Sequence, residues 1–66
     1  MKPLVSIIIP VYNKEKWIVQ TLRSVASQTY ENWECLIIDD GSTDNSLSLI
    51  NTFTDATRGN WKIISQ

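Results

Sequence analysis

Three short apolar stretches alternate along this 66-residue chain with two longer segments whose apolar residues recur at helical spacing. The apolar stretches run roughly from Leu4 to Pro10, from Trp33 to Asp39 and from Trp61 to Ser65. Near-continuous apolar runs of this kind suit parallel strands that are covered on both faces. The order therefore predicts an α/β fold, β-α-β-α-β, in which right-handed crossovers build a three-stranded parallel sheet. Pro10 lacks an N–H group, so we expect the first strand to close there.

The segment from about Lys14 to Gln28 is the first predicted helix, and Asn13 is a plausible N-terminal cap for it. Its apolar residues follow the i, i+4, i+7, i+8 spacing of one buried helix face. The residues expected on that face are Ile18, Leu22, Val25 and Ala26.

The second predicted helix runs from about Asp44 to Phe53, after a run of turn formers at residues 39–45. Ser42 or Thr43 can cap this helix, and the Asp44 carboxylate would complement its dipole. The core-facing residues expected here are Leu47, Ile50 and Phe53. A calcium loop through this run is excluded, because Asn45 and Asn51 stand where the EF-hand needs Gly and Glu.

Composition excludes several classes of function. Histidine is absent, which removes Ser–His and Cys–His catalysis and the commonest zinc ligand. The lone Cys35 cannot form an internal disulfide and is expected to be an inert core residue. The net charge is −1 with no basic cluster, so nucleic acid is not expected as a partner.

The apolar runs are far shorter than the roughly 20 residues that span a bilayer. No secretory signal peptide is recognisable, so we expect a cytoplasmic protein, which leaves open a location at the cytoplasmic face of a membrane. A chain this short buries only about 60% of its unfolded surface, and we expect marginal stability.

Two loops should meet where the first two strands end, since parallel sheets bind ligands outside the carboxyl ends of their strands. Residues 10–13 offer an aromatic ring and an amide, and residues 39–42 offer two carboxylates. The glycine-rich phosphate-binding motifs are absent. Carboxylates suit the base or ribose of a nucleotide, or a metal that carries its phosphates. An Asp that accepts from a ring N–H favours uracil, thymine or guanine over adenine, and Tyr12 can pack against the base.

Three sequence motifs follow one another along the chain. They are Val5-Ser6-Ile7-Ile8-Ile9-Pro10-Val11-Tyr12-Asn13, then Ser24-Val25-Ala26-Ser27-Gln28-Thr29-Tyr30, and then Glu34-Cys35-Leu36-Ile37-Ile38-Asp39-Asp40-Gly41-Ser42-Thr43-Asp44. In this order and spacing they resemble family 2 glycosyltransferases. The resemblance implies a GT-A fold, a nucleotide-sugar donor, a divalent metal (Mn or Mg) and inverting transfer to an acceptor hydroxyl. The donor that the resemblance implies is an NDP-sugar, and we expect a UDP-sugar, although the ring N–H argument leaves thymine and guanine open as bases.

The resemblance also implies which residues meet the nucleotide-sugar. Carried over to this chain, they are Pro10, Tyr12 and Asp40, with Asp39 ordering the loop or holding the ribose or base. The D-x-D metal motif and the catalytic base of the family have no match here. Residues 1–66 are therefore expected to be the N-terminal, nucleotide-binding part of a GT-A domain, inactive alone, with the metal ligands outside this chain. The implied acceptor is a saccharide or a lipid-linked glycan.

Three alternatives remain at this point. The chain is a non-catalytic fragment that binds nucleotide weakly or self-associates through an exposed sheet edge. It is half of a dinucleotide-dependent oxidoreductase domain, against which the missing glycine fingerprint argues. In the third alternative the residues of the two loops have only local roles. Asp39 and Asp40 are then turn or cap residues, and Tyr12 only packs against the start of the first helix.

Overall fold

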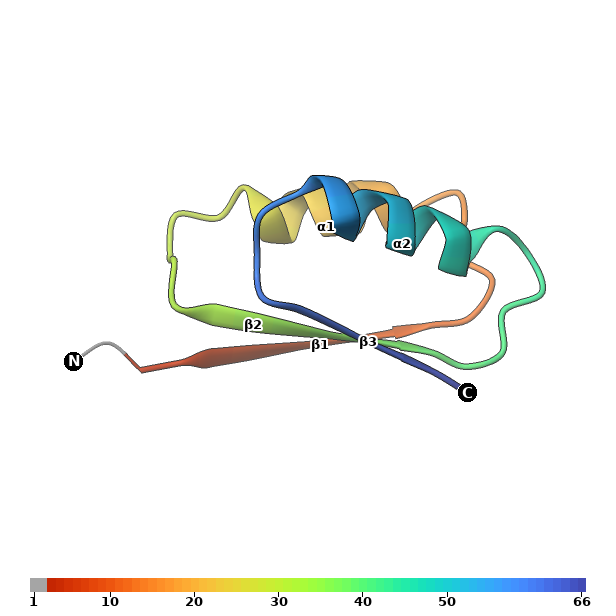
Figure 1. Cartoon of the computed structure of the whole chain (residues 1–66), viewed down its shortest axis with the longest axis horizontal. Helices are drawn as coiled ribbons and strands as arrows, with labels where there is room; N and C mark the ends of the chain where they lie inside the picture. Colours follow the sequence, from red (N-terminus) through yellow and green to blue (C-terminus); the bar gives the residue numbers. More distant parts are fainter. Residues whose placement is uncertain (1–2) are drawn as a thin grey trace.

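The computed structural model describes residues 3–66 and has two layers, a three-stranded parallel sheet and a pair of helices (Figure 1). The elements follow in the order β1 (Val5–Val11), α1 (Ile18–Ala26), β2 (Trp33–Asp39), α2 (Ser46–Ala56) and β3 (Trp61–Ser65). The predicted β-α-β-α-β order is confirmed, and β2 and β3 have the predicted bounds.

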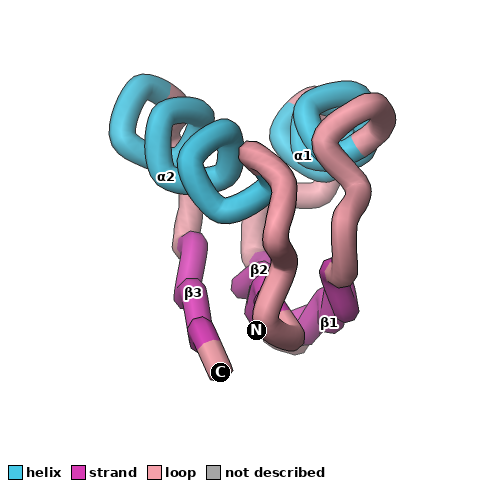
Figure 2. Tube along the Cα trace, turned by 90° about the vertical axis from the view of Figure 1, so that its right-hand side faces the viewer, coloured by secondary structure: helices cyan, strands magenta, loops and turns pink. Residues whose placement is uncertain are grey.

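The strand order is β1-β2-β3, and both strand pairs are parallel. Val5 pairs with Trp33 at one end of the sheet and Val11 with Asp39 at the other. Because the order advances in one direction, crossovers of one hand place both helices on the same face of the sheet. Figure 2 shows α1 and α2 side by side over that face.

The core lies between the sheet and the two helices. Leu22, Cys35, Ile37 and Ile50 are fully buried, and Val11 and Ile18 are nearly so. The predicted faces are thus confirmed at Ile18, Leu22 and Ile50, while Val25, Ala26, Leu47 and Phe53 are half-buried. Burial raises the pKa of the Cys35 thiol, which keeps it protonated and inert, as predicted.

Both helices begin later than predicted. Regular α1 starts at Ile18 rather than Lys14, and Trp17 occupies the N-cap position without a side-chain cap hydrogen bond. Helix α2 starts at Ser46, with Asn45 at the N-cap position, and ends at Ala56 rather than Phe53. The residues before each helix carry hydrogen bonds across to the other loop, described below, instead of continuing the helix.

Pro10 does not close β1, which continues to Val11. The carbonyl of Val11 accepts a hydrogen bond from the Asp40 amide at 2.9 Å, so Val11 is turned toward β2. Backbone groups of successive strand residues point to opposite sides, and the missing N–H of Pro10 therefore faces the free edge of the sheet. A proline is tolerated at that position because no strand of residues 3–66 pairs there.

The face of the sheet opposite the helices is uncovered, contrary to the expected cover on both faces. Ile8 in β1 is 61% exposed and Ile64 in β3 is 45% exposed. Leu36 and Ile38 of β2 are half-buried between them. The apolar run predicted a strand buried on both sides, but the two helices of this chain cover only one.

The amino end of this uncovered face is polar. Ser6 Oγ donates a hydrogen bond to Glu34 Oε1 at 2.8 Å, and Lys62 Nζ lies 3.3 Å from Glu34 Oε2. The hydrogen bond from Ser6, and then the contact with Lys62, hold the pKa of Glu34 below its ordinary value. Neither helix of residues 3–66 combines the length and apolar character needed to cross a membrane.

Replacing the buried Leu22 tests the helix-sheet core. We expect Leu22→Ala to lower the free energy of unfolding by about 2–5 kcal/mol, because it removes apolar contacts and leaves a cavity. Gln20→Ala, at an exposed position of α1, is the matched control and should change little. Urea unfolding followed by circular dichroism measures both; equal midpoints for Leu22→Ala and the parent chain would contradict this packing.

Candidate functional site

Tyr12 and Asp40 lie next to each other at the carboxyl ends of β1 and β2. The last registered pair of these strands is Val11 with Asp39, and the Asp40 amide bonds to the Val11 carbonyl. Tyr12 is 55% exposed, and Asp40 and Pro10 are also exposed, whereas Val11 and Asp39 are buried under the helices. The structure thus brings Pro10, Tyr12 and Asp40 to one accessible side of this edge.

Asp39 differs from its neighbour, because its side chain is only 2% exposed. Its Oδ2 accepts a hydrogen bond from the Ser42 amide at 3.3 Å, which closes the turn after β2. Its Oδ1 is buried without a hydrogen-bond partner within residues 3–66. Gly41, at φ 72°, lies inside this turn in the left-handed region that favours glycine. Asp39 therefore shapes the loop that presents Asp40.

Asn13 joins the two loops. The prediction that it caps α1 is wrong, because Trp17 occupies the N-cap position. Its backbone has φ 52°, a left-handed conformation that Asn tolerates better than most residues. Its Oδ1 accepts hydrogen bonds from the backbone amides of Thr43, at 2.8 Å, and Asp44, at 3.3 Å. In return, its own amide donates to Ser42 Oγ at 3.0 Å. The predicted capping roles of Ser42 and Thr43 are therefore wrong, because the Ser42 hydroxyl and the Thr43 amide and hydroxyl bond to Asn13 instead.

The next two residues continue the connection. The Lys14 amide donates to the buried Ser46 Oγ at 2.8 Å, and the Glu15 amide donates to Asp44 Oδ2 at 3.2 Å. Asp44 Oδ1 accepts from the Ser46 amide at 2.9 Å, which satisfies the first turn of α2. Three consecutive amides of one loop are thus bonded to side chains of the other. We call these bonds, with those of Asn13, the interloop lock.

Protonation of Asp44 would weaken the interloop lock. Burial alone would raise the pKa of Asp44, but the hydrogen bonds from Ser46 and Glu15 outweigh it and hold the pKa below its ordinary value. A carboxylate with a depressed pKa contributes stability that is present above the unfolded-state pKa and is lost as the pH falls through the folded-state pKa. The lock is therefore intact at neutral pH.

Sequence reasoning missed Ser46 and the cross-loop role of Asn13. Ser46 is fully buried, and its Oγ lies at the centre of the lock. The only signal for either was residue type, because Asn, Ser and Asp bond to nearby backbone in caps, turns and loops alike. Among residues 3–66, no three His, Cys, Asp or Glu side chains gather as metal ligands would. We therefore assign no residue to the divalent metal that the resemblance implies.

Two substitutions of Asn13 separate the contribution of its left-handed backbone to stability from the contribution of its side-chain oxygen. Asn13→Gly keeps the positive φ but removes the acceptor of two backbone N–H groups, and we expect a loss of about 1–3 kcal/mol. Asn13→Asp keeps both the acceptor oxygen and the tolerance of positive φ, so most of the stability should return. Urea unfolding of the two variants decides: if both unfold at the same midpoint, the Oδ1 contacts contribute nothing.

Solved structures with the same fold include TarS 1-349 from S. aureus. This chain superposes on it with a TM-score of 0.83 and 31% sequence identity, over 98% of this chain and 19% of that one. The TarS 1-349 structure in complex with UDP gives a TM-score of 0.80 at 30% identity, with the same shares covered. The β-α-β-α-β unit thus matches part of the TarS structure, and the predicted GT-A type of fold is confirmed.

Curated relatives are bacterial glycosyltransferases. An uncharacterized glycosyltransferase of Haemophilus influenzae is 51% identical over 53 residues, and the UDP-Glc:alpha-D-GlcNAc-diphosphoundecaprenol beta-1,3-glucosyltransferase WfgD of Escherichia coli is 49% identical over 53 residues. Each match covers 80% of this chain and 21% of the relative, so the chain spans about one fifth of the length of these proteins. The model of glycosyl transferase family 2 matches residues 6–66, and the chain therefore belongs to that family.

Proposed function

We propose that this chain forms the nucleoside-binding part of a glycosyltransferase that uses a UDP-sugar. The observation that carries the proposal is that exposed Tyr12 and Asp40 directly follow the last registered pair of β1 and β2, Val11 with Asp39, at the carboxyl ends of these strands. Ligands of open parallel sheets bind at this edge. The TarS structure with UDP and the UDP-Glc donor named for WfgD support uridine as the nucleoside.

Asp40 accepts the ring N–H of uracil in this proposal, and the Tyr12 ring packs against the base. An ionised carboxylate accepts hydrogen bonds but donates none, so it pairs with uracil N3–H and not with cytosine, whose N3 lacks a hydrogen. Pro10, exposed on the same side, borders the base. Asp39 acts through the loop: its Oδ2 holds the Ser42 amide, which fixes the direction of Asp40.

The sugar itself would be transferred with inversion to an acceptor hydroxyl. In that reaction Tyr12 and Asp40 position the donor by holding its base, and they transfer no proton, because they contact the nucleoside and not the reacting sugar. We assign no catalytic base and no metal ligand to this chain, and we propose that it does not transfer sugar alone. The lipid-linked acceptor named for WfgD supports a lipid-linked glycan as acceptor. The cytoplasmic location expected from the sequence stays a prediction.

Self-association is a second candidate, favoured by the uncovered apolar face with Ile8 and Ile64. The outer edges of β1 and β3, which pair with no strand of residues 3–66, add a route for strand pairing between copies.

Asp40→Ala should weaken UDP binding by on the order of tenfold to a hundredfold, because a hydrogen bond to a charged group contributes about 1.5–3 kcal/mol. The parent chain should bind UDP more tightly than CDP or ADP, with and without manganese. Asp40→Asn should narrow the gap between UDP and CDP, since an amide can also donate to cytosine N3. Amide chemical shifts in NMR titrations report both affinity and location.

Asp55→Ala, at an exposed position of α2, is the matched control and should bind UDP as the parent does. The assignment is wrong if Asp40→Ala binds UDP with parental affinity, or if UDP shifts amides away from Tyr12 and residues 39–42.

Charging the uncovered face tests self-association. Ile8→Lys should shift the chain toward monomer in sedimentation velocity, because it places an ammonium group at the 61% exposed apolar position of β1 on this face. Leu4→Lys, which changes an equally apolar residue before β1 that is 54% exposed, should leave the distribution nearly unchanged. A parent chain that sediments as a monomer at millimolar concentration would exclude this candidate.

A further inference from the structure

A cleft lies at the end of the sheet opposite the proposed nucleoside site, where the strands begin. Its volume is about 490 Å³, within the usual range for small-ligand pockets. The walls come from the end of α1, the α1–β2 connection and the α2–β3 connection. The lining residues that matter to the argument are Gln28, Tyr30, Glu31, Trp33, Gly59 and Asn60.

This cleft is separate from the nucleoside site. Trp33 is the first residue of β2 and Asp39 is the last, and at the rise of a strand the distance between them is about 20 Å. A nucleoside held by Tyr12 and Asp40 therefore does not reach it. Figure 1 places the two ends of the strands at opposite sides of the molecule.

The aromatic floor of the cleft is held in place by packing. The Trp33 ring meets the edge of Trp61 at 5.1 Å between centroids, and Phe53 meets Trp61 at 5.9 Å, both at steep interplanar angles. Trp61 Nε1 donates to the Thr57 carbonyl at 3.1 Å. A Cβ at Gly59 would lie 2.8 Å from the Trp33 ring and 2.7 Å from Trp61 Nε1. Only glycine lets the α2–β3 connection cross these rings so closely.

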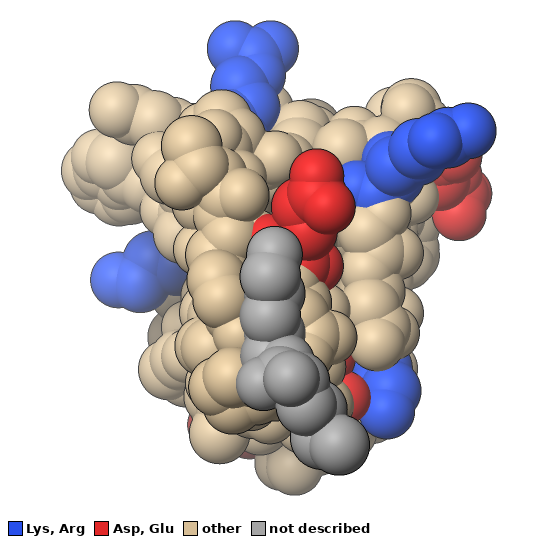
Figure 3. Space-filling model, turned by 90° about the vertical axis from the view of Figure 1, so that its left-hand side faces the viewer, with Lys and Arg blue, Asp and Glu red and all other residues tan. Residues whose placement is uncertain are grey.

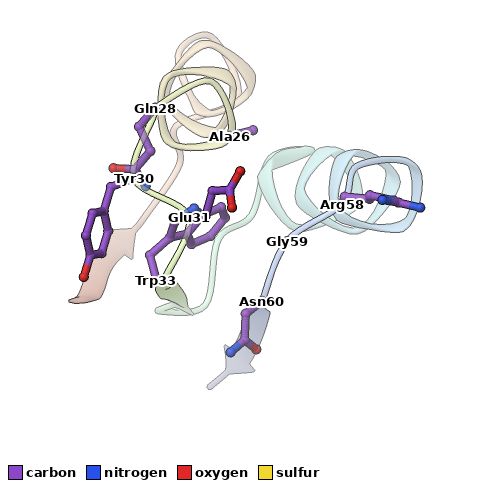
Figure 4. Close-up of a pocket in the computed structure, with 8 residues that line it drawn as sticks. All are labelled: Ala26, Gln28, Tyr30, Glu31, Trp33, Arg58, Gly59 and Asn60. Atoms are coloured by element: carbon purple, nitrogen blue, oxygen red, sulfur yellow. The ribbon is translucent and has the colours of Figure 1, made fainter. Parts of the chain in front are cut away.

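Polar side chains surround this floor. The side chains of Gln28, Glu31 and Asn60 make no hydrogen bonds within residues 3–66, which leaves them available to a ligand. Figure 4 shows the Trp33 ring and the Glu31 carboxylate between the end of α1 and the Gly59 segment, with the Arg58 side chain pointing away. The Tyr30 hydroxyl donates to the Pro3 carbonyl, which anchors that ring.

The charges of the cleft disfavour an anionic ligand. Of the two charged lining residues, Glu31 points its carboxylate into the cleft and Arg58 points away (Figure 4); Figure 3 shows acidic atoms near the middle of this end, and acidic and basic groups at its margins. A ligand that suits it is uncharged, rich in hydroxyl donors for Glu31, and able to exchange hydrogen bonds with the two carboxamides. It also needs an apolar face to lie on Trp33. A pyranose ring combines these features, with C–H groups on its faces and hydroxyls on its rim.

We infer that this cleft binds a neutral saccharide and thereby holds a glycan chain about 20 Å from the nucleoside site. The site anchors the glycan and does not react with it. The inference uses the membership of a family of glycosyltransferases but none of the residues assigned to the nucleoside, so the two proposals can fail separately.

The three tryptophans of the chain provide a direct test. We expect chitotetraose or maltotetraose, titrated into the ¹⁵N-labelled 66-residue chain, to shift the Trp33 indole N–H and the amides of Gln28, Glu31 and Asn60. Trp17, 58% exposed and remote from the cleft, is the internal reference and should not move. UDP should leave the Trp33 indole unmoved and shift Tyr12 and Asp40 instead.

The double variant Glu31→Ala/Asn60→Ala should lose at least about tenfold in saccharide affinity, because it removes two hydrogen-bonding side chains and leaves the backbone contacts in place. Glu15→Ala/Asn51→Ala makes the same changes at exposed positions outside the cleft and should bind as the parent does.

Three results would overturn the inference. The first is that neither saccharide shifts the Trp33 indole N–H signal. The second is that the saccharide-induced shifts persist in the double variant. The third is that the cleft binds an apolar dye but neither saccharide, as an apolar docking surface would. Saccharide shifts at Trp33 without UDP shifts at Asp40 would support the cleft while rejecting the proposed nucleoside site.

Discussion

The hydrogen bonds of Asn13 hold together the end of the molecule where the site lies. Both loops leave the sheet at the carboxyl ends of their strands, and neither has enough apolar residues to pack against the core. Asn13 replaces such packing with an acceptor for two backbone amides and a donor to Ser42. Its backbone is left-handed, and regular α1 begins only at Ile18, after a turn in which the Trp17 and Ile18 amides bond to the Lys14 carbonyl. Loop geometry here depends on polar contacts that compete with helix formation.

Burial of Asp39 follows from the same arrangement and separates the roles of two adjacent carboxylates. Alternation along β2 turns Asp39 under the helices, while Asp40, one residue later, is exposed. One oxygen of Asp39 closes the loop and the other has no partner within residues 3–66, an arrangement that costs stability. The hydrogen bond from the Ser42 amide to Asp39 Oδ2 nevertheless fixes the loop at the proposed ligand-binding edge. Asp40 can then meet a ligand without first ordering its own backbone.

Much of this fold follows from the sequence alone, because strands and buried helix faces are set by the spacing of apolar residues. The bounds of β2 and β3 and the buried Leu22 and Ile50 were predicted on that basis. The helix starts were not, since Asn13 and Ser42 have the same residue types whether they cap locally or bond across loops. The pairing of Tyr12 with Asp40 followed from parallel topology, but the difference in burial between Asp39 and Asp40 needed the register. The cleft at the amino ends was not predicted: the motif of residues 24–30 contributes Gln28 and Tyr30 to it, but nothing in the sequence shows that Gly59 and Asn60 of the α2–β3 connection lie opposite them.

The uncovered face of the sheet links self-association to nucleotide binding. Exposed Ile8, Pro10 and Ile64 lie on the side of the sheet to which Asp40 is exposed, so any layer that covers this face also borders the proposed nucleoside site. In a chain that spans about one fifth of its relatives, a second copy is one source of such a layer. If the copy improves the site, UDP strengthens association, and if it blocks the site, UDP weakens it, because binding and association share one free-energy cycle. The dependence of UDP affinity on protein concentration therefore shows whether the second copy improves or blocks the proposed site.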